Sequence, residues 1–321
     1  MKLSAPVCLS MVLLTVAYSY SQNPQLEITL SDGNVREGFI KVDGGKVWFR
    51  IAGTDKKRIP LICVHGGPGA PHDYMEPVEK LSDERPVIFY DQLGCGNSER
   101  PADTSLWNIR RFVEEFATVC KALQLNEFHI LAQSWGTMLI AEYMQRKPQG
   151  VKSIVFGGSA FSATRFAQDC RAYLEELPDT QQQAIQKAEA TGNYTSPEYQ
   201  EAMNTFYSLH VCRLEPMPLC VQHTFEKMGT EVYLHMWGPS EFSVMGTLKQ
   251  FDIINKLKNI TVPVLLACGE FDEATPEATR FYQQNIPNSE MVVFKDASHM
   301  HHIEKEDEFL KILRDFLHKN E

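Results

Sequence analysis

The sequence lacks several features that would point to common classes of function. No CxxC pair occurs among its eight cysteines, so a structural zinc site has no support. Basic residues are too few for a nucleic-acid partner, with 31 Lys and Arg against 41 Asp and Glu and a formal net charge of −10. There is no internal repeat and no low-complexity linker. The 321 residues, 43% of them hydrophobic, are those of a globular protein with a substantial buried core.

The chain also lacks a hydrophobic run long enough to cross a bilayer comfortably. Residues 7–17 are mostly apolar, whereas a membrane helix needs about 20 such residues. Lys2 precedes this run, and small and polar residues follow it up to Asn23, an order typical of a secretory signal peptide. We therefore predict a signal peptide over residues 1–21, a secreted or periplasmic protein, and no membrane association once the segment is removed. The alternative is a disordered or buried N-terminal extension on a cytoplasmic protein.

Six of the eight cysteines fall into two groups. Those in apolar runs are expected in the core: Cys63, Cys120 and Cys268. Cys170, Cys212 and Cys220 share the middle of the chain, and an exported protein could pair two of them. The sequence does not decide the pairing.

Strand-like and helix-like segments alternate along most of the chain. Residues 38–42 and 46–51 flank Asp43-Gly44-Gly45 and predict a hairpin. Short apolar runs suit parallel strands that are buried on both faces, and they lie at 60–64, 87–90, 128–132, 153–156, 262–267 and 291–294. Helical patterns lie at 107–123, 138–146, 276–285 and 306–319. This order predicts an α/β protein with a mostly parallel sheet, of the α/β-hydrolase type.

One interval breaks the alternation. Between about residues 161 and 246 there is no convincing buried strand, only helix-compatible sequence such as 165–177 and 179–191. We predict a helical cap over residues 161–246, inserted between two parts of a core formed by residues 22–160 and 247–321.

Ser134 is the predicted nucleophile. Residues 128–133 form a strand-like run that leads into Ser134, and a helical pattern follows at once. A serine on such a turn is held with its hydroxyl above the sheet, and the residues two before and two after it must be small because helix and strand pass closely. Those residues are Ala132 and Gly136. Alanine in place of the usual glycine is a mild departure.

A serine hydroxyl needs a histidine to accept its proton and an acid to orient that histidine. In this fold the three follow in the order serine, acid, histidine, each at a strand end. Asp272 follows one predicted strand and His299 follows the next, which makes Ser134, Asp272 and His299 the predicted catalytic triad. Asp296 is the fallback acid, less favoured because it shares a short loop with His299.

Backbone donors for the oxyanion are predicted in a glycine-rich turn after an earlier strand, His65-Gly66-Gly67-Pro68-Gly69. The amide of Trp135, directly after the nucleophile, is one expected donor. Gly67 is the expected second donor, since Pro68 has no N–H. The turn lacks the Gly-Lys-Ser/Thr ending of a phosphate loop.

No cofactor and no metal is expected. His301 and His302 are adjacent and have the side chains to bind a metal, but a solvated loop or the start of a helix is the favoured interpretation.

The motifs taken together resemble those of proline iminopeptidases. The residues that carry the resemblance are His65–Pro71, Asp91–Ser98, Gln133–Gly136, Gly269–Glu273 and Ala297–His299. It extends from about Gly38 to the C-terminus, and the segment Gly238–Phe242 is most similar to the tricorn-interacting aminopeptidase subgroup. The resemblance implies a serine exopeptidase that releases an N-terminal residue, proline or another small or apolar one, from short peptides or aminoacyl amides.

The resemblance also implies how the substrate amine is held. In the family, glutamates that match Glu241 and Glu273 bind the α-amine, which is substantially cationic near neutral pH. Glu273 adjoins the triad acid and is expected near the mouth of the active site. Tyr233 resembles an aromatic residue that lines the pocket.

Two other functions stay open. One is an esterase or amino-acid amidase on the same fold, because a fold does not determine a substrate. The other is a catalytically silent binding protein, although such proteins usually lose a triad residue.

Overall fold

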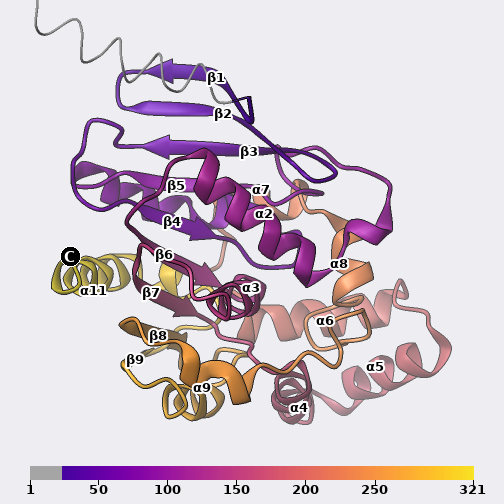
Figure 1. Cartoon of the computed structure of the whole chain (residues 1–321). Coiled ribbons are helices and arrows are strands. Elements are labelled where there is room, and N and C mark those ends of the chain that lie inside the picture. The colour runs from indigo at the N-terminus through magenta and orange to yellow at the C-terminus, as the bar shows by residue number, and fades with distance from the viewer. Residues whose placement is uncertain (1–23) are drawn as a thin grey trace, which may run out of the picture.

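A nine-stranded sheet runs through the structure in the order β1-β2-β3-β5-β4-β6-β7-β8-β9 (Figure 1). This computed structural model describes residues 24–321, so the predicted signal peptide lies outside the described residues. The strands are β1 (Leu26–Asp32), β2 (Val35–Val42), β3 (Gly45–Ala52), β4 (Leu61–Val64), β5 (Val87–Tyr90), β6 (Phe128–Gln133), β7 (Val151–Gly157), β8 (Val264–Gly269) and β9 (Ser289–Phe294).

The pairing of the strands confirms the mostly parallel sheet. Strands β5, β4, β6, β7, β8 and β9 pair in parallel, whereas β1, β2, β3 and β5 pair antiparallel. The predicted hairpin is β2 and β3, in which Val42 lies opposite Gly45. Parallel neighbours bring the carboxyl ends of β4, β6, β7, β8 and β9 to one edge of the sheet, where the loops that carry Ser134, Asp272 and His299 begin.

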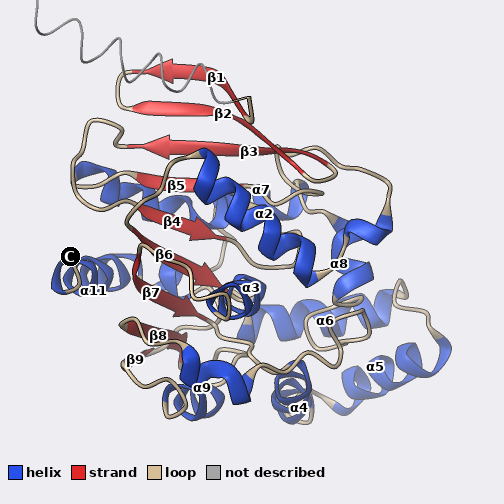
Figure 2. Ribbon diagram, viewed as in Figure 1, coloured by secondary structure: helices blue, strands red, loops and turns tan. Residues whose placement is uncertain are grey.

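Helices cover both faces of the sheet (Figure 2). On one face α2 (Ile109–Ala122) and α3 (Trp135–Met144) pack on alternate strand residues such as Ile62 and Val64. On the other face the 3-10 helix η1 (His72–Asp83) and α11 (Glu306–Lys319) pack on the intervening residues of the same strand, Leu61 and Cys63. Alternation of side chains along a strand explains why these strands are apolar throughout, since both faces are buried. The remaining core helices are α9 (Pro276–Gln283), α10 (His301–Glu304), η2 (Thr104–Leu106) and η3 (Ile254–Asn259).

The two edges of the sheet differ from expectation. Strand β1 was not predicted, because its apolar residues alternate with polar ones and form no continuous run, and the residues after Leu26 are exposed. Strand β9 was expected to be buried on both faces, and this is wrong, because only Phe294 of its six residues is buried. An edge strand has a neighbour on one side only, and solvent reaches the rest of its surface.

Between β7 and β8 the chain forms α4 (Ala163–Leu174), α5 (Asp179–Thr191), α6 (Pro197–His210), α7 (Leu219–Glu226) and α8 (Thr230–Met236). We call residues 161–246 the helical insertion. Figure 1 shows α5, α6 and α8 grouped beyond the carboxyl ends of β4 and β6. The boundaries at 160 and 247 stay a prediction.

The cysteines of residues 24–321 are all unpaired, so Cys170, Cys212 and Cys220 form no disulfide with one another here. Cys63, Cys120 and Cys268 are buried, as expected of small core residues. Within the same part of the chain, no helix combines the length and hydrophobicity needed to cross a bilayer.

Candidate active site

Ser134 lies at a sharp turn between β6 and α3. Its φ of 56° and ψ of −124° are values that a residue with a side chain rarely adopts, and such backbone strain is common at functional sites. Hydrogen bonds hold the turn: Ser134 N donates to Gly157 O at 2.9 Å, and Thr137 N donates to Ser134 O at 2.8 Å. The nucleophile that the sequence predicts is therefore rigidly placed at the end of a central strand.

The small residues around Ser134 are needed for close packing. A Cβ on Gly136 would lie 2.4 Å from Val64 O and 2.9 Å from His65 O, so α3 could not approach β4 with any other residue there. Ala132 is fully buried in β6. The steric requirement read from the sequence thus holds for Gly136.

Asp272 and His299 meet as the chain order predicts. His299 Nδ1 lies 2.7 Å from Asp272 Oδ1, and that oxygen also accepts a hydrogen bond from Ala274 N at 2.8 Å. Asp272 is fully buried and His299 is 5% exposed. The fallback acid Asp296 is exposed and does not take this position.

The charge environment of His299 favours its protonated form. Burial lowers the pKa of His299, but the Asp272 carboxylate, its hydrogen bond and the charge of Glu241 outweigh that effect, so the pKa is raised above its ordinary value of 6.5. A histidine with this partner can accept a proton from Ser134 and hold the resulting charge.

The backbone of His299 is tied to the helical insertion. His299 N donates to His210 O at 3.0 Å, and Met300 N donates to Val211 O at 2.9 Å. His210 Nδ1 also lies 2.9 Å from Phe271 O, beside the triad acid. The end of α6 is thereby joined to both strand-end loops that carry Asp272 and His299.

A cavity lies between the sheet edge and the helical insertion. Ser134 and His299 both line it, with Gly67 from the glycine-rich turn. The other lining residues are Ala70, Tyr74, Gln133, Tyr207, Val211, Thr224, Phe225, Met228, Glu241 and Met300.

The glycine-rich turn is shaped so that Gly67 faces this cavity. Gly67 has a φ of 102°, and a Cβ there would lie 2.5 Å from the amides of Gly69 and Ala70. The amide of Gly66 is already used, because it donates to the Tyr74 hydroxyl at 2.7 Å. Trp135 is the first residue of α3, and amides at a helix N-terminus have no acceptor within the helix. These positions suit two backbone donors for an oxyanion.

Two carboxylates lie close to His299. Glu241, which is partly buried, lines the cavity, and Glu273 Oε1 lies 4.0 Å from His299 Nε2. Glu273 is fully buried, deeper than a position at the mouth of the site, and neither of its carboxylate oxygens has a hydrogen-bond partner. Burial and the nearby charges of Glu241 and Asp272 raise the pKa of Glu273 well above its ordinary value of 4.5. Burial likewise raises the pKa of Glu241.

Aromatic hydroxyls position Glu241. Tyr233 Oη donates to Glu241 Oε1 at 2.8 Å, and Glu241 N donates to Tyr207 Oη at 3.2 Å. Tyr207, rather than Tyr233, is the tyrosine of the helical insertion that lines the cavity. Tyr233 was expected to line the pocket, whereas it lies behind the glutamate.

The sequence interpretation of His301 and His302 is wrong in one respect. Both lie in α10, at the start of a short helix as expected, but both are buried rather than solvated. Tyr74 and Gln133 were missed as site residues. Tyr74 follows the glycine-rich turn within a 3-10 helix, so no local motif marks its side chain.

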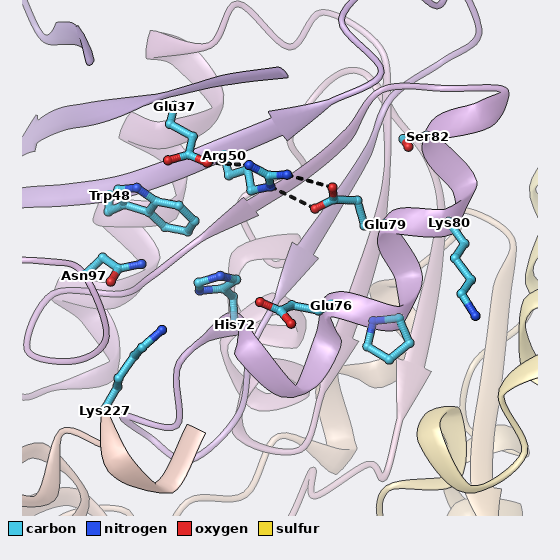
Figure 3. Close-up of a pocket in the computed structure, with 11 residues that line it drawn as sticks. Glu37, Trp48, Arg50, His72, Glu76, Glu79, Lys80, Ser82, Asn97 and Lys227 are labelled. Carbon is cyan, nitrogen blue, oxygen red and sulfur yellow. Dashed lines mark hydrogen bonds and ion pairs between the residues drawn. The ribbon is translucent and has the colours of Figure 1, made fainter. Parts of the chain in front are cut away.

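A second pocket lies away from the triad, between β3 and η1 (Figure 3). Figure 3 shows Arg50, one of the residues that line this pocket, hydrogen-bonded to Glu37 and Glu79. His72, which also lines this pocket, has its Nδ1 atom 2.7 Å from Asp91 Oδ1.

Three residues near this pocket, His72, Asp73 and Glu76, have ligand atoms within 4.8 Å of one another. Lys227 Nζ donates a hydrogen bond to Asp73 and forms an ion pair with it. A metal ion could bind here only by displacing that ammonium group. The cavity that Ser134 and His299 line is therefore the candidate active site.

Comparison with known proteins gives a consistent result. A family model described as the α/β-hydrolase fold matches residues 59–306. A proline iminopeptidase of Heyndrickxia coagulans is 45% identical over 282 residues, which cover 88% of this chain and 98% of the relative. One from Clostridium botulinum is 37% identical, covering 89% and 99%. The crystal structure of a proline iminopeptidase of Mycobacterium smegmatis superposes with a TM-score of 0.82 at 37% identity, covering 88% and 98%.

Proposed function

Because this chain belongs to the proline iminopeptidase family of α/β-hydrolases, we propose that it is a serine aminopeptidase that releases an N-terminal proline, or another small or apolar residue, from short peptides. The observation that carries the proposal is the pair of carboxylates near His299, Glu273 fully buried and Glu241 partly buried. Glu273 has two buried oxygens without a hydrogen-bond partner, close to Glu241. A cationic α-amine would supply the missing donors and the opposite charge.

In the proposed reaction the Ser134 hydroxyl attacks the carbonyl carbon of the N-terminal residue. His299 accepts the Ser134 proton and then gives it to the leaving amine, and Asp272 holds the imidazole in position. The amides of Gly67 and Trp135 stabilise the oxyanion. Water then attacks the acyl-enzyme with His299 again as the base, which releases the amino acid and restores Ser134.

We propose that the helical insertion acts as a cap that limits the site to a free N-terminus. It supplies Tyr207, Phe225, Met228 and Glu241 to the lining of the cavity. A carboxylate placed beside the reacting serine leaves room for one residue before the cleaved bond.

Arylamides test the substrate class. We expect Pro- and Ala-arylamides to be hydrolysed with a kcat/KM about 100-fold or more above that of N-acetyl-Ala-arylamide, since acetylation removes the charge that the carboxylates bind. Steady-state kinetics on the three arylamides and on a simple ester measure this. Equal rates on blocked and free substrates, with a fast ester, would instead favour the esterase alternative. A fluorophosphonate probe that leaves Ser134 unlabelled would favour a silent binding protein.

We further propose that residues 1–21 direct export to a secreted or periplasmic location. The support is the sequence pattern of Lys2, the apolar run over residues 7–17 and the polar residues that follow. When the full chain is expressed with its own N-terminus, we expect the exported protein to begin near Gln22 by intact-mass measurement. Recovery of uncleaved protein in the cytoplasm alone would contradict export.

A further inference from the structure

Beyond the triad, a chain of hydrogen bonds joins the three loops that form the cavity. Gly66 N donates to Tyr74 Oη at 2.7 Å, and Tyr74 Oη donates to Gln133 Oε1 at 3.0 Å. Gln133 Nε2 then donates to His299 O at 3.2 Å. We propose that Tyr74 and Gln133 are positioning residues. They hold the glycine-rich turn that carries Gly67, and the backbone of His299, in fixed positions relative to Ser134.

Each group in the chain has a defined direction. The Tyr74 hydroxyl accepts a hydrogen bond from Gly66 N and donates one to Gln133 Oε1. Phenylalanine has the same ring but can make neither bond. The Gln133 amide must both accept from Tyr74 and donate to His299, which a carboxylate or a thioether cannot do. Gln133 directly precedes Ser134, and it is 3% exposed, so water does not readily replace these bonds.

The backbone of Tyr74 is held from two further sides. Tyr74 N donates to Thr224 Oγ1 of the helical insertion at 2.9 Å, and His302 Nε2 lies 3.2 Å from Tyr74 O. Thr224 and His302 belong to helices α7 and α10. Tyr74 is therefore fixed by the insertion and by the segment after His299, while its hydroxyl holds the turn that carries Gly67.

The residue on the other side of the nucleophile supports the same turn separately. Trp135 Nε1 donates to Gln92 Oε1 at 2.9 Å, and Gln92 Nε2 donates to His65 O at 3.0 Å. This second connection stays intact when Tyr74 or Gln133 is changed. Loss of the hydrogen bonds through Tyr74 and Gln133 should therefore let Gly67 and His299 shift relative to Ser134, while the glycine-rich turn stays bound through Gln92.

The test compares Tyr74→Phe, Gln133→Met and their double variant. We expect each single change to lower kcat about 10- to 100-fold with KM within about threefold, because a small misplacement of the reacting groups has an effect of this size. The double variant should be no slower than the worse single one, since both changes break the same chain. Fluorophosphonate labelling and ester hydrolysis should slow in parallel with arylamide hydrolysis.

Two further variants separate positioning from general damage. Tyr90→Phe removes another fully buried tyrosine hydroxyl, which has no hydrogen-bond partner, and it should leave kcat unchanged. Gln133→Glu keeps the size but adds a charge near His299, so the acid limb of kcat/KM against pH should move to higher pH. Gln133→Met should not move that limb.

Some results would overturn the proposal. These are unchanged kcat in Gln133→Met, effects of the two single changes that multiply in the double variant, or an equal loss in Tyr90→Phe. The inference takes from the proposed function only that Ser134 and His299 carry out acyl transfer. If the wild-type chain hydrolyses esters and reacts with the fluorophosphonate but cleaves no arylamide, the aminopeptidase assignment fails, and the same variants still test the positioning role on the ester.

Discussion

Replacing Ser134 with alanine should lower kcat/KM for every arylamide and ester by about 10⁵- to 10⁶-fold, because no other group supplies the nucleophile. The measurement is steady-state hydrolysis with the variant purified apart from the wild type, together with loss of fluorophosphonate labelling. Full residual activity would remove Ser134 from the mechanism. Circular dichroism should show an unchanged fold, since the Cβ and the backbone turn remain.

A second change at the same position tests whether the turn is strained. Ser134→Gly should be as inactive as Ser134→Ala but more stable, because glycine adopts a φ of 56° without the cost of a Cβ. We expect the free energy of unfolding of Ser134→Gly to exceed that of Ser134→Ala by about 1–3 kcal/mol, the usual cost of holding a residue in a rarely populated backbone region. Thermal unfolding of the two inactive variants side by side measures the difference. Equal stability would contradict strain at this turn.

Glu273→Gln should reduce kcat/KM for free-amine arylamides by on the order of 10²-fold, because glutamine cannot ionise when the cationic amine binds and so cannot replace one carboxylate of the pair that we propose binds it. Hydrolysis of a simple ester without an amine should change little. The matched control is Glu277→Gln, at a side chain that is 91% exposed, which should leave both activities intact. Equal loss on the amine-free ester would show that Glu273 supports catalysis in general and not recognition of the amine.

The same variant should be more stable than the wild type, and increasingly so as the pH rises. The pKa of Glu273 is raised in the folded state by burial and by the charges of Glu241 and Asp272. The folded protein therefore holds a proton that the unfolded chain releases above its ordinary pKa of 4.5, and stability is lost as the pH rises toward the folded value. Glutamine has no such charge, so the gain in Tm should be small at pH 5 and a few degrees at pH 8. A gain that did not depend on pH would contradict this account.

The core elements and the triad could be predicted from the sequence because their signals are local. A strand buried on both faces is apolar throughout, as at residues 87–90, and Ser134 and Asp272 each follow such a strand. His299 follows the edge strand β9, which is mostly not buried but still has an apolar run at residues 291–294, and the three residues occur in the order that the fold requires. Gly136 is detected for the same reason, since the turn requires a small residue two positions after the nucleophile.

What the sequence did not predict depends on contacts between distant segments. Tyr74 reaches Gln133 across 59 residues, and Gln133 reaches His299 across 166. The burial of His301 and His302 depends on aromatic neighbours such as Phe294 and Phe309, which no motif brings together. Strand β1 alternates Leu26, Ile28 and Leu30 with polar residues, but it is mostly exposed and has no continuous apolar run.

Two backbone hydrogen bonds join the C-terminal end of α6 to the loop that carries His299, the proposed catalytic base, and they limit how this enzyme can open. Lifting the end of α6 off the sheet would pull on His299 through His210 and on Met300 through Val211. If the insertion hinged at this corner, His299 would therefore be displaced from its catalytic position each time a peptide entered. We therefore expect substrate to enter and product to leave by movement of the parts of the insertion that are not anchored there, while this corner stays in place through the reaction cycle.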